Sequence, residues 1–355
     1  MSVSFIQPRT AAGGSSADSG DPQQQDWAKP AGFDALRGRV VVLTGASSGI
    51  GRATAQALAS QGADVVLAAR NAEALDEVAK QCNTERGSAI AVPTDVTDAD
   101  AMRALRDAAI ARYGHIDVWI NNVGVGAVGL FDSTPIDAHR RVVESNLIGH
   151  MNGAHAVLPH FRERCRGILI NMISLGGWVA SPYAAAYTAS KFGIRGFSES
   201  LRAELSKLPR VHVCDVYPTF VDTPGISHGA NYTGRSIAPP PPVLDPRRVA
   251  DAIVSLVKRP RASVYVGAPA WPGILAHAVA PDWVARIMMR LMEFSLGRAD
   301  RAARTDGNLF EPSKGNAVDG GFRASPERKA VAGVAVAAVG AAVAVAWLAS
   351  RRGRR

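Results

Sequence analysis

Short, nearly continuous apolar runs alternate with helical patterns through most of this chain. The runs lie at 40–44, 64–69, 88–93, 117–121, 167–172 and 211–216, and they consist mainly of Val, Ile, Leu and Ala. Strands without polar alternation are buried on both faces, which is typical of a parallel sheet covered by helices. The pattern therefore predicts a doubly wound α/β sheet, a class of fold that binds ligands at the carboxyl ends of its strands.

Polar residues and glycines gather at those strand ends. The segment "TGASSGIG" (44–51) follows the first strand, Asp95 the third, "NNVG" (121–124) the fourth and Ser174 the fifth. A purely structural origin would scatter such residues along the chain. Their clustering predicts one ligand site at the carboxyl edge of the sheet.

The segment 44–51 has three glycines between a predicted strand and a predicted helix. The first would permit a tight turn, the second would let the backbone approach a pyrophosphate, and the third would let the helix pack closely on the sheet. Three glycines alone are a weak signal, but this position favours a dinucleotide site with the first helical amides facing the phosphates. The expected contacts in this turn are Gly45, Ser47, Ser48, Gly49, Ile50 and Gly51.

Arg70 stands at the end of the second predicted strand, 19 positions after Gly51. An acidic residue about 20 positions on would bind the ribose 2′-hydroxyl of NAD, whereas an arginine favours the 2′-phosphate of NADP. The sequence therefore predicts NADP(H) in preference to NAD(H). The alternative is a solvated arginine that opens the next helix.

Tyr187 and Lys191 are four positions apart on one predicted helix, so their side chains share a face. A lysine ammonium about 4 Å from a phenol, at an effective dielectric of about 20, favours the phenolate by at most about 4 kcal/mol. That would lower the phenol pKa by about 3 units, which suits an acid/base group. Ser174 could then hydrogen-bond the substrate oxygen. The alternative is a half-buried aromatic with a lysine extending past it.

Together these motifs resemble the short-chain dehydrogenase/reductase family. The resemblance covers about 39–267 and rests on "TGASSGIG", "NNVG", Ser174 and "YTASK". It implies a single Rossmann-like domain in which Tyr187 is the acid/base, Lys191 lowers its pKa and binds the nicotinamide ribose, and Ser174 positions the carbonyl. The further implied roles are a helix kink and proton-relay water at Asn146, adenine contacts at Asp95 and Val96, and an adenosine-ribose contact at Asn122.

The chain departs from the family pattern at two positions. Val123 stands where the family usually has alanine, and Thr219 stands where it usually has glycine after the sixth strand. The valine is a small change. Thr219 is expected near the nicotinamide amide and could shift the backbone there.

The net charge of +9 does not indicate a nucleic-acid partner, because residues 323–355 alone carry a net +6. The three cysteines are scattered, which fits a reducing compartment. His150, His155 and His160 would spread around a helix, so we expect surface or capping histidines and no metal site.

The two ends of the chain differ in composition from its middle. Residues 1–32 are expected to be a flexible lead-in, since they are rich in Gly, Ser, Gln and Pro and lack the apolar core of a signal peptide. The predicted organisation continues with a catalytic domain (33–300), a lid within it (about 219–243), a helical extension (about 270–297), a polar linker (301–329), a transmembrane helix (330–350) and a basic tail (351–355).

The predicted lid and the helix at 281–297 carry many large apolar side chains, and Trp178 and Val179 follow Ser174. These features favour a lipophilic carbonyl or alcohol as substrate. The alternative for 281–297 is a helix that packs in the core or in a homo-oligomer. The function predicted overall is an NADP(H)-dependent carbonyl/alcohol oxidoreductase; the alternative is a non-catalytic nucleotide-binding scaffold or redox sensor on the same fold.

Residues 330–350 contain 21 positions without a charge, flanked by basic residues. At about 1.5 Å per residue such a helix would span about 30 Å, the thickness of a bilayer core. The sequence predicts a C-terminal apolar helix as a single membrane anchor, with the catalytic domain in the cytoplasm where NADPH is. The alternative is an Ala/Val-rich helix packed on the protein or on a partner chain.

Overall fold

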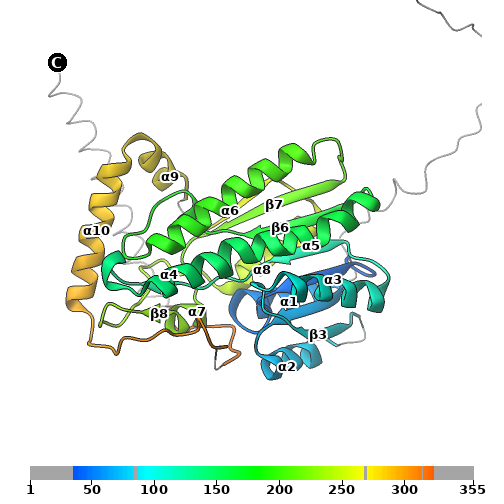
Figure 1. Cartoon of the computed structure of the whole chain (residues 1–355), viewed down its shortest axis with the longest axis horizontal. Helices are drawn as coiled ribbons and strands as arrows, with labels where there is room; N and C mark the ends of the chain where they lie inside the picture. Colours follow the sequence, from blue (N-terminus) through cyan, green and yellow to red (C-terminus); the bar gives the residue numbers. More distant parts are fainter. Residues whose placement is uncertain (1–34, 84–85, 268–269, 314, 324–355) are drawn as a thin grey trace, which may run out of the picture.

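A computed structural model describes residues 35–83, 86–267, 270–313 and 315–323. Within them a seven-stranded parallel sheet forms the centre of the molecule (Figure 1). The predicted doubly wound sheet is confirmed, since the order reverses between the first strand and the fourth. In spatial order the strands are β3 (Ala89–Pro93), β2 (Asp64–Ala69), β1 (Val40–Thr44), β4 (Val118–Asn121), β6 (Gly167–Met172), β7 (Val211–Pro218) and β9 (Ser263–Val266).

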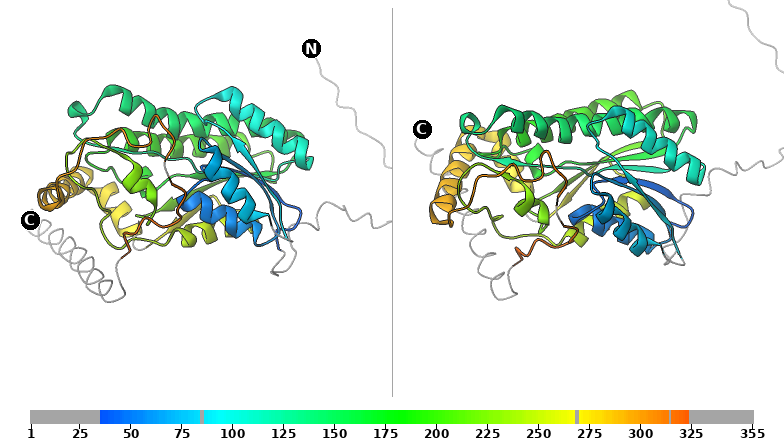
Figure 2. Two further views of the ribbon diagram at one scale, coloured as in Figure 1. Left: turned by 90° about the horizontal axis from the view of Figure 1, so that it is seen from below. Right: turned by 60° about the horizontal axis from the view of Figure 1, so that its bottom comes forward.

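Helices cover both faces of the sheet (Figure 2). Each face has its own apolar core. Leu58, Leu75 and Ile253 contribute to one core, and Leu105 and Phe161 to the other. The first layer comprises α1 (Gly49–Ala59), α2 (Ala72–Cys82) and α8 (Pro246–Lys258); the second comprises α3 (Ala99–Tyr113), α5 (Gly149–Glu163) and α6 (Ala185–Glu204).

A single π-helical turn, Glu144–Ile148, joins α4 (Ile136–Val143) to α5. Asn146 lies in this turn and is fully buried. An inserted π turn bends a helix. The kink that the family resemblance implies at Asn146 therefore has a local structural cause.

The predicted lid contains short regular elements. Within it α7 (Pro224–His228) is followed by β8 (Ala230–Asn231), which pairs in parallel with β5 (Ala127–Val128). The sequence did not indicate α7 or β8, because neither element is long enough to produce a periodic pattern.

The helical extension forms α9 (Ala270–Val279) and α10 (Pro281–Arg298). The alternative in which residues 281–297 pack in the core of this chain is wrong, because no residue of α10 is buried. Leu291 and Phe294 are 51% and 60% exposed. In the part of the chain that the structure describes, no helix is long and apolar enough to cross a membrane.

Residues 305–313 and 315–323, which we term the C-terminal strap, lie within the range predicted as a polar linker and contact the domain. Thr305 exchanges two backbone hydrogen bonds with Asn231 of the lid, and Leu309 is completely buried. Figure 1 shows this segment in orange beside α7 and β8. Its polar composition is explained by many hydrogen bonds to the domain. The predicted lead-in (1–32), anchor (330–350) and basic tail lie outside the described residues.

Candidate active site

The glycine turn between β1 and α1 has the close contacts that the sequence predicted. Gly45 and Gly49 have φ angles of +68° and +55°, which disfavour other residues. A β-carbon at Gly51 would overlap the carbonyl oxygen of Gly45. Asn122 donates its side-chain amide to the carbonyls of Thr44 and Gly45, at 3.1 and 3.2 Å. The turn is therefore held tightly enough to cradle a pyrophosphate.

The amino end of α1 lies at the mouth of this turn. Ser48 is the N-cap residue but its side chain caps no amide, and Ser47, Ser48 and Ile50 are partly exposed. The N–H of Gly49 donates to the carbonyl of Ala317 in the strap, at 2.9 Å. The strap thus contacts one of the amides predicted to face a phosphate.

Arg70 follows β2, as predicted, but its guanidinium contacts the strap. Its two terminal nitrogens donate to four carbonyls, of Asn308, Leu309, Phe310 and Glu311, at 2.6 to 3.2 Å. Neither the 2′-phosphate contact nor the solvated-arginine alternative describes this arrangement.

Asp95 and Val96 follow β3 beside Arg70. Val96 is buried, and Asp95 accepts hydrogen bonds from Thr97 and from Arg141, the latter at 2.8 Å. Burial acts to raise the pKa of Asp95, but these hydrogen bonds outweigh it and hold the pKa below its ordinary value. Sequence reasoning missed Arg141, which also donates to the Leu309 carbonyl of the strap.

The predicted catalytic residues meet at the carboxyl edge of the sheet. Ser174 follows β6, and Tyr187 and Lys191 lie on α6. Ser174 accepts a hydrogen bond from the Gly176 N–H at 3.1 Å. The Lys191 ammonium lies 5.6 Å from the Tyr187 ring centroid and donates to the Met172 carbonyl at 3.0 Å.

The pKa of Tyr187 is raised, in contrast to the lowering expected from the sequence. Burial raises the pKa of Tyr187, and a side-chain hydrogen bond with Ser174 only opposes that effect. Burial also lowers the pKa of Lys191 to about 7, because its side chain is almost completely enclosed. Both shifts disfavour the charged form, as desolvation does.

Asn146 is connected to Tyr187 through one intermediate residue. Its side chain bonds both the N–H and the carbonyl of Val125, and its amide donates to the Ser190 hydroxyl at 3.0 Å. That hydroxyl in turn donates to the Tyr187 carbonyl at 2.7 Å. Asn146 therefore links the helix kink to the backbone of the helix that carries Tyr187.

His150 lies in the interior near Lys191, which corrects the prediction of a surface or capping histidine. It is 1% exposed, and its Nε2 has no hydrogen-bond partner among the described residues. Burial, and next the charge of Lys191, lower its pKa to about 3, so His150 is neutral at physiological pH. No periodic signal could have revealed it.

Thr219 is accommodated by a glycine on the neighbouring strand end. Its N–H donates to the Val266 carbonyl at 3.0 Å. The next residue, Gly267, has a φ of +111°, and a β-carbon there would collide with the Thr219 hydroxyl. The side chain that replaces the family glycine thus uses space that Gly267 leaves open.

Trp178 is half-buried beside the catalytic residues. It packs against Tyr217, and the Arg195 guanidinium lies 3.4 Å from its ring centroid. Tyr232 of the lid is also enclosed, and its hydroxyl donates to Asp306 of the strap at 2.5 Å. Phe220, at the start of the lid, is 46% exposed.

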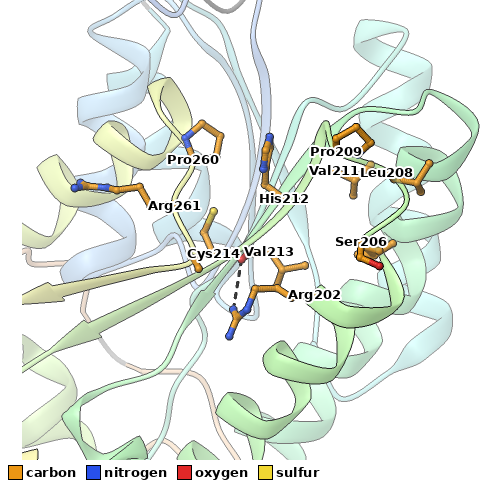
Figure 3. Close-up of a pocket in the computed structure, with 12 residues that line it drawn as sticks. Arg202, Ser206, Leu208, Pro209, Val211, His212, Val213, Cys214, Pro260 and Arg261 are labelled. Carbon is orange, nitrogen blue, oxygen red and sulfur yellow. Dashed lines mark hydrogen bonds between the residues drawn. The ribbon is translucent and has the colours of Figure 1, made fainter.

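A hollow of about 270 Å³ lies at the amino edge of the sheet, opposite the carboxyl edge that carries the predicted catalytic residues (Figure 3). It is lined by the end of α6, the start of β7 and the residues before β9, with Arg202 donating to the Val213 carbonyl. This hollow contains none of the residues predicted for catalysis or for cofactor binding. The candidate site is therefore the carboxyl edge.

Comparison with known proteins agrees with this site. Residues 39–229 match the short chain dehydrogenase family. The uncharacterized oxidoreductase YxnA of Bacillus subtilis is 32% identical over 329 residues, covering 90% of this chain and 92% of the relative. Human dehydrogenase/reductase SDR family member 7 is 35% identical over 187 residues, covering 52% of this chain and 55% of the relative.

Solved structures give the same result. A metagenomic short-chain oxidoreductase, in complex with NADP, matches with a TM-score of 0.56 at 32% identity, covering 65% of this chain and 97% of its own. An alcohol dehydrogenase from Thermococcus sibiricus, complexed with 5-hydroxy-NADP, matches with a TM-score of 0.56 at 26% identity, covering 64% of this chain and 95% of its own. This chain belongs to the short-chain dehydrogenase/reductase family. It is an oxidoreductase that acts on CH–OH donors with NAD(P) as acceptor.

Proposed function

We propose that this enzyme interconverts a carbonyl and a primary or secondary alcohol, with Tyr187 as general acid/base. The observation that supports this best is the meeting of Ser174, Tyr187 and Lys191 beside the glycine turn. A bound nicotinamide would donate or accept the hydride. In reduction Tyr187 protonates the substrate oxygen, Ser174 positions that oxygen, and Lys191 stabilises the resulting phenolate.

NADP(H) is the cofactor we favour. Arg70 stands where an enzyme specific for NAD carries an acidic residue. The two solved relatives described above were obtained with NADP or 5-hydroxy-NADP. The test is the ratio of kcat/KM for NADPH to that for NADH, and a preference for NADH would contradict the assignment.

The substrate class we favour is lipophilic. Phe220 of the lid, Leu275 of α9 and Trp283 of α10 expose apolar surface. The lid is tied to the end of α10, since the N–H of Ser236 donates to the carbonyl of Asp300. A screen of NADPH oxidation across ketosteroids, retinal, long-chain aldehydes and small ketones tests this class. A marked preference for small charged substrates would refute it.

Tyr187→Phe is expected to lower turnover by about 10² or more, with NADPH binding nearly unchanged, because only the proton transfer is lost. Turnover is measured with the best substrate of the screen, and binding by NADPH fluorescence. The alternative function, a non-catalytic scaffold or redox sensor, predicts no NADPH oxidation by the wild type with any carbonyl. Unchanged turnover in the variant would remove Tyr187 from the mechanism.

We also propose that residues 330–350 anchor the enzyme in a membrane with the catalytic domain in the cytoplasm. Their 21 uncharged positions support a span, and the supply of NADPH supports the orientation. A homo-oligomer through α10 is a separate proposal, supported by the exposed Leu291 and Phe294.

A further inference from the structure

The C-terminal strap crosses the proposed nucleotide site from end to end. It begins paired with the lid at Asn231, continues over the guanidinium of Arg70, and reaches the amino end of α1 at Gly49. It ends where Asp222 accepts hydrogen bonds from Phe322 and Arg323. The strap therefore contacts both places that a dinucleotide needs, the end of β2 and the glycine turn.

The four backbone carbonyls of residues 308–311 accept hydrogen bonds from all the terminal N–H groups of Arg70. Each of its two terminal nitrogens has two N–H groups, and each makes two hydrogen bonds to the strap. An arginine that recognises a phosphate uses the same terminal fork. Carbonyl oxygens are also the negative ends of their dipoles, so they repel a phosphate dianion at this position. The terminal N–H groups of Arg70 cannot bind all four strap carbonyls and a 2′-phosphate at the same time.

Further contacts near Arg70 hold the strap against the domain. Leu309 is 0% exposed and belongs to the apolar cluster that contains Val125 and Val142, with Tyr187 at its margin. Arg141 donates from Nε to the Leu309 carbonyl at 3.1 Å. The next side chain, Phe310, is 46% exposed. Leu309 therefore contributes to closure through a fully buried side chain, whereas the half-exposed side chain of Phe310 contributes less.

We propose that the strap is a latch that competes with the 2′-phosphate of NADP(H) for Arg70, so that loading of the phosphorylated cofactor releases residues 308–311. This inference rests on the proposed preference for NADP(H). NAD(H) lacks the competing group and leaves the strap on Arg70. The strap then adds a conformational cost to NADP(H) binding, and the apparent affinity equals the intrinsic affinity multiplied by the fraction of time that the strap is open.

Hydrogen exchange on the full chain, with two small probes, tests the competition without any turnover. The probe 2′,5′-ADP carries the 2′-phosphate, and 5′-AMP is the matched control without it. At saturation, 2′,5′-ADP is expected to speed exchange in peptides covering 305–313, where the Asn308 N–H donates to the His228 carbonyl in the closed strap. Exchange with 5′-AMP is expected to stay at the level of the free enzyme.

Three outcomes would overturn the latch. They are unchanged or slower exchange at saturating 2′,5′-ADP, equal acceleration by 5′-AMP, and failure of 2′,5′-ADP to bind at all. The proposed oxidoreductase function is judged separately by the NADPH screen, so an active enzyme with an unresponsive strap would refute the latch alone.

A pair of variants provides an independent measurement. Leu309→Ala weakens closure, so the Kd of 2′,5′-ADP is expected to fall by about fivefold or more, while the Kd of 5′-AMP changes little. Phe310→Ala is the matched control, since its side chain is half exposed and contributes less to closure, so both Kd values are expected to stay close to those of the wild type. Equal Kd values for 2′,5′-ADP in wild type and Leu309→Ala, with the thermal transition retained, would overturn the competition.

Discussion

Burial acts in opposite directions on the pKa values of Tyr187 and Lys191. It raises the first and lowers the second to about 7, so Tyr187 is neutral near neutral pH and Lys191 loses its charge as the pH rises through about 7. A neutral lysine gives little stabilisation to a phenolate. A bound dinucleotide brings negative phosphates near the site, which would favour the charged lysine. At the residue scale, the protonation states of Tyr187 and Lys191 therefore depend on their burial and on the charges buried with them.

The pH dependence of cofactor capture follows from Lys191. The apparent kcat/KM at limiting NADPH reports ionisations of the free enzyme. Lys191 is charged below its pKa of about 7 and neutral above it. We therefore expect kcat/KM for NADPH to fall by up to about tenfold per pH unit above about pH 7. At saturating NADPH, kcat should stay level to higher pH, and identical profiles for the two parameters would contradict this account.

At the scale of single elements, the first turn of α1 depends on Gly51, whose side-chain position is already filled. The space that a β-carbon of Gly51 would occupy belongs to the Gly45 carbonyl oxygen. Backbone cannot move away as a flexible side chain could. The helix and the turn would have to separate, which would also displace the amides that face the phosphates.

Gly51→Ala is therefore expected to lower the free energy of unfolding by about 1–3 kcal/mol. We also expect it to weaken nucleotide binding by about tenfold or more, because the cradle is displaced. Thermal unfolding and nucleotide titration measure the two effects.

Gly196→Ala is the matched control. Gly196 lies within α6, and a β-carbon there meets nothing within 4 Å. Removing a helical glycine should raise stability by about 0.5–1 kcal/mol with nucleotide affinity unchanged. If Gly51→Ala behaved like this control, the close approach in the turn would not matter for binding.

At the scale of the whole molecule, the strap joins the lid, the nucleotide edge and α8 into one unit. Arg323 donates to Asp222 at 2.9 Å and also to Asp245, the N-cap residue of α8. A chain that ends at Arg328 would retain all of these contacts. The proposed anchor can therefore be removed without disturbing the described fold.

Full-length protein is expected to remain in the membrane fraction after alkaline carbonate washing, because a span of about 20 apolar residues does not leave a bilayer when charge contacts are broken. The chain ending at Arg328 is expected to be soluble and active. Full-length protein in the soluble fraction would rule the anchor out. An inactive truncation that still folds would mean that the tail contributes to the chemistry.

The sequence alone determined the succession of six of the sheet strands along the chain, the glycine turn and the pairing of Tyr187 with Lys191. These features are local in sequence: β1, β2 and β6 have the bounds that their apolar runs predicted. A turn of fixed spacing and a four-residue helical step leave signatures that a short window can detect.

Only the tertiary structure decided the partners of Arg70, the burial of His150 and the position of the strap. Arg70 and Leu309 are 239 positions apart, and the acceptors on the strap are backbone carbonyls that every residue carries. Such contacts leave no pattern in the sequence, because they depend on which distant segments the folded core brings together and on which charged groups it removes from water.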